Sequence, residues 1–125
     1  MEDEFRVTPI GVVHRDETAA SDAECMIEIR PELQLAMLGI EAGRRLQVLY
    51  WMHRLGDDDR RILQCHPRGD RSRPKRGVFA LRSPMRPNPI GSTVVEVKAV
   101  RGNELLVTGL DALDGSPVVD LKIAT

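Results

Sequence analysis

Large aromatic side chains are scarce in this chain. Only 3% of the 125 residues are Phe, Trp or Tyr, whereas 42% are hydrophobic. A single core is therefore possible, and it must be built from aliphatic side chains. Long apolar runs are also missing, and the first residues, Met-Glu-Asp-Glu, do not resemble a secretion or lipidation signal. We therefore expect one domain over residues 1–125, in a cytoplasmic protein with no membrane partner.

Three further features that the sequence lacks limit the cofactors and partners that this protein can bind. The two cysteines, Cys25 and Cys65, lack metal-ligand spacing, so we interpret them as reduced structural thiols and predict no metal site. Long helical patterns are missing, which excludes a Rossmann-type fold, and no strand-Gly-x-Gly-x-x-Gly-helix segment is present. An excess of positive charge is missing too, because the formal net charge is −1. Any contact with nucleic acid must therefore depend on local charge.

Short segments in which polar and apolar residues alternate predict an antiparallel sheet. We expect strands at residues 5–14, 25–30, 46–53, 92–100, 104–109 and 118–123, and a turn at residues 56–59. Pro31 is expected to start a short helix that ends near Leu38, and residues 101–103 to close a hairpin. Residues 46–53 are apolar on both faces, which suggests cover from the barrel interior and from a partner subunit. The fold class is therefore all-β: a mostly antiparallel, closed or nearly closed β-barrel with one or two short helices.

Two motifs carry most of the functional information. Residues 77–91 read GVFALRSPMRPNPIG, and their three prolines predict a rigid loop that cannot join a strand ladder. Arg82, Arg86 and Asn88 suit this loop to hold a ligand, since guanidinium groups meet carboxylates with paired donors. Residues 110–122 read LDALDGSPVVDLK and offer an acidic glycine turn at residues 113–116. Taken alone, that turn could simply be capped by its own Asp114.

Both motifs resemble those of the TsaA-like (TrmO) family, in the same order and at the same spacing. Weaker similarity at residues 10–13 and 39–53 extends the resemblance over most of the chain. The resemblance implies a β-barrel that binds S-adenosyl-L-methionine and is commonly a homodimer. The best-known members methylate N6 of threonylcarbamoyladenosine beside the anticodon of tRNA. The chain resembles a compact, divergent member, because residues 16–23 lack the family's Pro-Arg-Gln element, Arg54 stands where Gln is frequent, and Lys122 is not followed by Pro-Tyr and further chain.

The resemblance also suggests site residues. In the family, the positions matching His53, Arg54, Arg82 and the turn at residues 113–116 line the cofactor site. The expected S-adenosyl-L-methionine site comprises His53, Arg54, Arg82, Ser83, Arg86, Asn88, Leu113, Asp114, Gly115 and Ser116. Removal of the proton from the acceptor nitrogen would benefit from a base, for which His53, Asp114 and Asp120 are candidates. His53 is our candidate catalytic residue, because imidazole titrates nearest neutrality.

A cationic segment precedes the proline-rich loop. Residues 66–76 contain one acidic residue and five basic ones, Arg68, Arg71, Arg73, Lys75 and Arg76. The segment predicts electrostatic contact with the phosphates of tRNA, although it could also be a solvated loop with no partner. Three functions are thus open: methylation of a modified adenosine in tRNA, methylation of a small metabolite, and binding of S-adenosyl-L-methionine or RNA by a barrel without catalysis.

Overall fold

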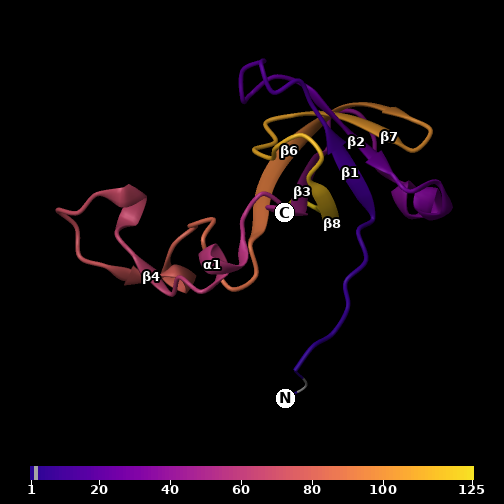
Figure 1. The fold of residues 1–125 in the computed structure, drawn as a ribbon. Helices are drawn as coiled ribbons and strands as arrows, with labels where there is room; N and C mark the ends of the chain where they lie inside the picture. The colour runs from indigo at the N-terminus through magenta and orange to yellow at the C-terminus, as the bar shows by residue number, and fades with distance from the viewer. Residues whose placement is uncertain (2) are drawn as a thin grey trace. The chain divides into compact units, whose positions relative to one another are not determined.

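The computed structural model describes residue 1 and residues 3–125, which form two compact units. Unit 1 comprises Met1–Trp51 and Gly91–Thr125, and unit 2 comprises Met52–Ile90. Unit 1 contains a closed barrel with the strand order β1-β2-β7-β6-β3-β8 (Figure 1). Its strands are β1 (Gly11–His14), β2 (Cys25–Ile29), β3 (Arg45–Trp51), β6 (Ile90–Arg101), β7 (Glu104–Thr108) and β8 (Pro117–Ile123). The predicted all-β barrel is confirmed.

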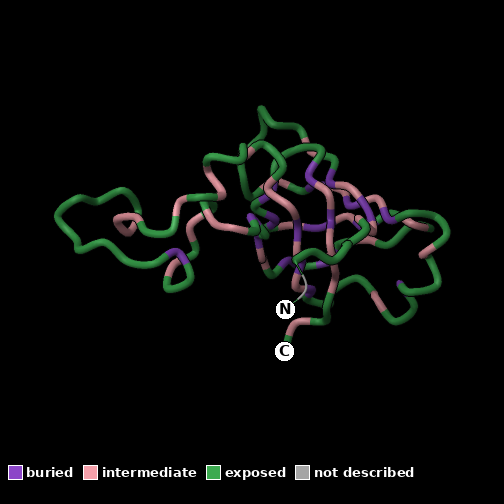
Figure 2. The backbone as a smooth tube through the Cα atoms, turned by 60° about the horizontal axis from the view of Figure 1, so that its bottom comes forward, coloured by how far each residue is buried: buried purple, intermediate pink, exposed green. Residues whose placement is uncertain are grey.

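The ladders of the barrel are antiparallel between β1 and β2, β1 and β8, β2 and β7, β3 and β8, and β6 and β7. Alternation along these strands builds the core, since successive side chains point to opposite faces. On β3, for example, Leu46, Val48 and Tyr50 are buried, whereas Gln47 and Leu49 are half-buried. Most of the buried hydrophobic residues belong to the barrel strands, and Figure 2 shows in purple where buried positions lie along the backbone. The core is aliphatic apart from Tyr50, as the composition predicts.

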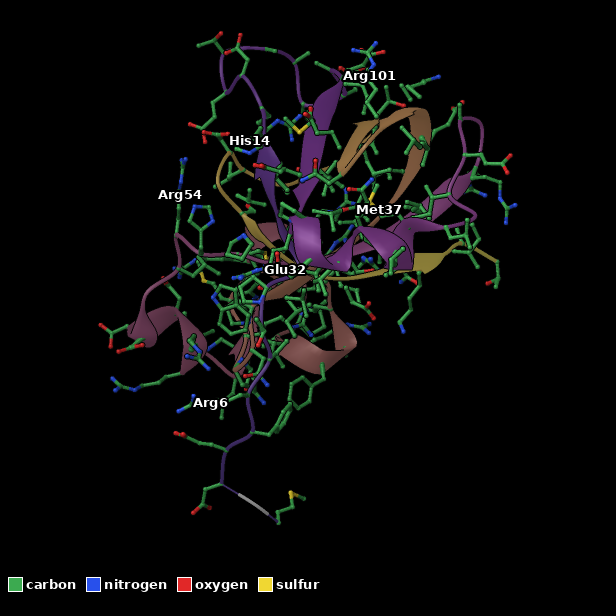
Figure 3. All side chains as sticks on the ribbon, turned by 90° about the vertical axis from the view of Figure 1, so that its right-hand side faces the viewer. Arg6, His14, Glu32, Met37, Arg54 and Arg101 are labelled. Atoms are coloured by element: carbon green, nitrogen blue, oxygen red, sulfur yellow. The ribbon has the colours of Figure 1, made fainter. Side chains whose placement is uncertain are left out.

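A 3₁₀ helix, η1 (Pro31–Met37), follows β2, so the expected short helix is present with a tighter winding. Pro31 lies in its first turn, where a missing N–H costs nothing. Met37 is buried, whereas Glu32 on the same helix is exposed (Figure 3). The part of the chain that the structure describes contains no helix that is long and apolar enough to span a membrane.

Two predicted strand boundaries and one predicted turn are wrong. The first strand starts at Gly11 rather than at residue 5, and Phe5 is 84% exposed. Strand β3 ends at Trp51 rather than at His53, because the Met52 N–H donates to the Pro89 carbonyl at 2.8 Å instead of to a neighbouring strand. The predicted turn at residues 56–59 is a one-turn helix, α1 (Asp57–Arg60), whose Asp59 Oδ2 accepts the Gly56 N–H at 2.9 Å. This bond satisfies one of the N–H groups that a helix start leaves unpaired.

Unit 2 has little regular structure. Beside α1 it contains a two-stranded sheet of β4 (Gln64–Cys65) and β5 (Arg76–Gly77) and two 3₁₀ turns, η2 (Pro67–Gly69) and η3 (Val78–Ala80). The two units differ strongly in charge. Unit 2 has ten Arg and Lys residues and four Asp, a formal charge of +6, whereas unit 1 has eight against fifteen acidic residues, or −7. Together they give the net charge of −1, so the near-neutral composition hides two oppositely charged units.

Candidate functional site

The acidic glycine turn at residues 113–116 is fastened to β1 in unit 1. The Gly115 N–H donates to the Val13 carbonyl at 2.8 Å, and the Val13 N–H donates to the Ser116 carbonyl at 3.0 Å. Gly115 has a φ of +81°, a conformation that favours glycine. Ser116 is buried, and its hydroxyl donates to the Leu113 carbonyl at 2.7 Å. The turn is therefore closed from within, and Leu113 and Asp114 are its exposed side chains.

Arg15 supports this turn, and the sequence analysis missed it. Its Nη1 donates to the carbonyls of Leu110 and Ala112 at 2.7 and 2.6 Å, and its Nη2 donates to the Ser21 carbonyl at 2.9 Å. The backbone N–H of Arg15 also donates to Asp114 Oδ1 at 2.9 Å. One half-buried residue just past β1 thus fixes both the approach to the turn and its carboxylate.

The proline-rich loop is shorter than predicted, because Gly77 belongs to β5 and residues 90–91 belong to β6, so the loop spans residues 78–89 of unit 2. Arg86 shapes this loop. Its Nη1 donates to the carbonyls of Leu81 and Ser83 at 3.3 and 3.1 Å, and its Nη2 donates to the Val78 carbonyl at 3.1 Å. Ser83 Oγ in turn accepts the Met85 N–H at 3.2 Å. Because three carbonyls of the loop already occupy the Arg86 guanidinium, we assign Arg86 chiefly to loop architecture. Arg82 is exposed, so a carboxylate in solution can reach its guanidinium.

A second arginine that sequence reasoning missed holds the other half of this loop. Arg60, at the end of α1, donates from Nε to the Pro87 carbonyl at 2.7 Å and from Nη2 to Asn88 Oδ1 at 3.4 Å. Asn88 itself is exposed, with its amide oxygen directed to Arg60. The one-turn helix therefore positions an arginine against the loop. Neither Arg15 nor Arg60 belongs to a motif, so only the fold shows what each one contacts.

The candidate bases His53 and Asp120 belong to different units of the chain. His53 and Arg54 are exposed residues of unit 2, in a turn closed by the Leu55 N–H and the Met52 carbonyl at 3.3 Å. Asp120 lies on β8 of unit 1, where its Oδ1 accepts the Leu121 N–H at 2.9 Å and its Oδ2 is 3.2 Å from Lys122 Nζ. Asp120 thus has partners on its own strand, which favours a structural role for it over a role as a base.

The predicted cationic segment forms a short hairpin. Cys65 pairs with Arg76 and Gln64 with Gly77, and His66 Nδ1 bonds the Arg73 carbonyl at 2.7 Å. A wide hollow of about 1060 Å³ lies within unit 2, between this hairpin and the start of the proline-rich loop. It is lined by the basic residues Arg68, Arg71, Arg73, Lys75 and Arg82 and by apolar side chains that include Ile62, Leu81 and Met85. Four of the five predicted RNA-contacting residues are therefore brought together, and Arg76 lies in the adjoining strand β5.

The hairpin and the loop supply no metal site. Among residues 1 and 3–125, no three His, Cys, Asp or Glu side chains are placed to hold a metal ion. Both cysteines are free thiols, as predicted.

Sequence comparisons point to one family. Residues 9–123 match the family model of the tRNA-methyltransferase O N-terminal domain. A probable S-adenosyl-L-methionine-binding protein of Methanothermobacter thermautotrophicus is 44% identical over 128 residues, covering 95% of this chain and 89% of the relative. A mouse tRNA (adenine(37)-N6)-methyltransferase is 30% identical over 112 residues, covering 86% of this chain and 26% of the mouse protein.

Structural comparison agrees with these matches. The crystal structure of TrmO from Pseudomonas aeruginosa superposes with a TM-score of 0.71 at 28% sequence identity, covering 98% of this chain. The chain spans 56% of that TrmO chain, so it matches little more than half of the bacterial protein.

Proposed function

The chain belongs to the tRNA-methyltransferase O N-terminal domain family, and on that premise we propose that it binds S-adenosyl-L-methionine and transfers the methyl group to N6 of adenosine 37 in tRNA. The observation that carries this proposal is the family match over residues 9–123, which includes both the proline-rich loop and the acidic glycine turn. The name of the Methanothermobacter relative suggests the methyl donor, and the name of the mouse relative suggests the acceptor nucleotide.

The side chains of both segments fit this donor chemically. Its methionine end has a carboxylate, for which the exposed Arg82 offers paired guanidinium donors. Its amine and ribose hydroxyls are donors, for which Asp114 offers a carboxylate that the Arg15 N–H holds in place. Its adenine needs an apolar contact, and Leu113 is 48% exposed on the same turn. The carboxylate, the amine and hydroxyls, and the adenine of the donor thus each have a residue of matching chemistry in one of the two motifs.

Catalysis under this proposal is mainly a matter of orientation. When bound, the sulfonium of the donor supplies an already activated methyl group, so the protein must align donor and acceptor nitrogen and exclude water. The bonds of Arg86 and Arg60 to loop carbonyls keep the proline-rich loop in one shape, which lowers the ordering cost of binding. His53 is proposed as the group that takes up the acceptor proton.

Calorimetry with S-adenosyl-L-methionine tests donor binding. Arg82→Lys keeps the charge but loses the paired donors, so we expect the dissociation constant to rise roughly tenfold. Arg101→Lys, at the tip of the β6–β7 hairpin, is the matched control and should bind normally (Figure 3). Equal affinities of the two variants for S-adenosyl-L-methionine would show that Arg82 does not contact the donor.

The role of His53 is tested by turnover at saturating donor. His53→Ala should lower the maximal rate by about 10²-fold or more if imidazole is the base, with little change in donor affinity. An undiminished maximal rate would show that His53 is not the base.

A small-metabolite acceptor is the second candidate. It keeps the same donor, since the name of a relative that is 44% identical specifies S-adenosyl-L-methionine binding without specifying an acceptor. A protein that binds the donor tightly and leaves tRNA unmethylated would support this candidate over the first.

The proposal includes a homodimer, as the resemblance implies. Light scattering on the purified protein should give about 28 kDa, twice the chain mass of 14.0 kDa. A mass of 14 kDa at micromolar concentration would contradict the dimer and leave donor binding to be tested separately.

A further inference from the structure

The tip of the cationic hairpin has an unusual backbone. Arg68 has φ 54° and ψ 26°, and Gly69 has φ 70°. The Asp70 N–H donates to the Pro67 carbonyl at 3.0 Å, which closes a four-residue turn around these two residues. Two successive positive φ values with this bond define a type I′ β-turn. Such turns favour Asn-Gly at the two central positions.

Arg68 is therefore a conformationally costly residue at its position. Among residues 1 and 3–125 it is the one non-glycine residue with a positive φ. Arginine has a Cβ and lacks the short polar group that lets Asn tolerate the left-handed region. Arg68 is also exposed, so packing does not explain it. Strain of this kind at an exposed position points to a function for the side chain.

The surroundings of Arg68 indicate what it contacts. Arg68, Arg71, Arg73 and Lys75 border the hollow of unit 2, whose other wall includes Leu81 and Met85 from the proline-rich loop. Asp70 is the sole acid of residues 66–76, and its Oδ2 lies 3.6 Å from Arg73 Nε. Four cations thus face one anion in a unit with a formal charge of +6. A partner with a regular series of negative charges matches this surface.

Local bonds hold the hairpin in shape. Ser72 donates its N–H and its hydroxyl to Asp70 Oδ1 at 3.0 and 2.6 Å. The His66 ring and the Arg73 carbonyl join the two sides at 2.7 Å, and the Gly69 N–H donates to the His66 carbonyl at 3.0 Å. The basic side chains are therefore presented from a preorganised backbone, which reduces the entropy lost on binding.

We propose that this hollow binds the sugar-phosphate backbone of RNA, with the Arg68 guanidinium at the tip of the type I′ turn contacting a phosphate. The inference rests on the proposed function, which makes tRNA the RNA concerned. Arg71, Arg73 and Lys75 add electrostatic contacts, and the apolar wall faces the less polar ribose. Recognition by such a surface depends on charge and shape and does not read the base sequence.

The turn offers a variant that separates binding from stability. Arg68→Asn places the residue that type I′ turns prefer at this position, so its thermal unfolding midpoint should equal or exceed that of the parent protein. Affinity for tRNA should fall roughly tenfold, as expected for the loss of one charge-assisted contact. The slope of log K against log salt should also become shallower by about 1. Arg101→Asn removes the same charge from unit 1 and should leave affinity and slope nearly unchanged.

Filter binding to tRNA over a range of NaCl concentrations gives both quantities. Unchanged tRNA affinity in Arg68→Asn at an unchanged or higher midpoint would overturn the inference, and so would equal losses in Arg68→Asn and Arg101→Asn. The inference would also be overturned if inorganic phosphate, at a concentration equal to that of the tRNA phosphate groups, displaced tRNA from the protein. A site for a free anion would then explain the binding. Equally tight binding of duplex DNA would show a general polyanion surface and contradict a site for RNA.

The two proposals fail separately. Donor binding is measured by calorimetry on the parent protein without RNA, so its absence would refute the proposed function while the effect of Arg68→Asn on tRNA binding could still be measured. Conversely, methyl transfer with the same KM for tRNA in the parent protein and in Arg68→Asn would refute the RNA site and leave the enzymatic proposal intact.

Discussion

Arg15 illustrates at the residue scale how one side chain can stabilise a site without belonging to its motif. Replacing it with Ala removes three hydrogen bonds to carbonyls, two of them to residues 110 and 112. We expect a loss of about 2–4 kcal/mol in the free energy of unfolding and a weaker donor affinity. Arg15→Lys keeps the charge but cannot bridge both carbonyls, so it should recover stability only in part. Denaturant unfolding measures the stability, and calorimetry measures the affinity for the donor. An unchanged free energy of unfolding and an unchanged donor affinity in both variants would contradict the stabilising role of Arg15.

The two thiols should differ in reactivity. Cys25 is 4% exposed on β2, and burial raises the pKa of its thiol, against which the nearby Arg15 charge acts in the lowering direction. A raised pKa leaves less thiolate at pH 8, so Cys25 should resist alkylation, whereas the half-buried Cys65 borders the hollow of unit 2. Titration with a disulfide reagent should detect one fast thiol per folded chain and two in denaturant. Equal rates for both thiols in the folded protein would contradict this expectation, and Cys65→Ser identifies the fast one.

Residues whose chemistry is local could be predicted from the sequence, and those with distant partners could not. Arg82 and Asp114 could be proposed as site residues because they lie in motifs whose residue types match a charged ligand. Arg15 was missed because its partners are backbone carbonyls 95 and 97 residues away, which carry no sequence signal. Arg86 was found, but as a ligand residue, because its contacts within its own loop depend on how that loop folds.

At the scale of elements, two glycines flank the proline-rich loop and have different tasks. A Cβ on Gly91 would overlap the ring of Tyr50, which is buried and donates its hydroxyl to the Asp111 carbonyl. The nearest atom to a Cβ on Gly77 is the Leu63 carbonyl oxygen at 3.9 Å. Gly91→Ala should therefore cost about 1–3 kcal/mol through overpacking, whereas Gly77→Ala should be neutral or stabilising by up to about 1 kcal/mol.

Thermal unfolding of these two variants distinguishes a packing role from a conformational one. A midpoint for Gly91→Ala as high as that for Gly77→Ala would contradict the packing of Tyr50 against Gly91.

The same scale shows what period-two patterns can predict. The β6–β7 hairpin and the strands at residues 25–29 and 117–123 follow from alternation and turn residues. The start of β1 and the end of β3 cannot be predicted from alternation, because they depend on where the neighbouring chain stops offering hydrogen-bond partners. Residues 5–9 alternate in polarity but have no ladder partner. The first backbone bonds are those of Ile10, whose N–H donates to the Val118 carbonyl at 2.8 Å and whose carbonyl accepts the Arg30 N–H at 2.9 Å.

At the scale of the whole molecule, the most informative property is the uneven distribution of charge between the two units, which the overall composition does not show. The net charge of −1 divides into +6 on unit 2 and −7 on unit 1, and composition alone does not show this division because it depends on which residues fold together. Aliphatic composition and the two motifs were sufficient to predict a barrel of this family. The hairpin that presents the basic residues depends on the β4–β5 pairing and the type I′ turn, for which the sequence gives only weak signals.

The reaction that we propose for this chain is the transfer of a methyl group from S-adenosyl-L-methionine to N6 of adenosine 37 in tRNA. Its most direct test is incubation of the purified protein with methyl-tritiated donor and tRNA that carries unmethylated threonylcarbamoyladenosine. The account predicts tritium in tRNA that digestion and chromatography locate on N6 of that nucleotide, at a rate that falls in Arg82→Lys and not in Arg101→Lys. Full donor occupancy without any transfer to tRNA would contradict it.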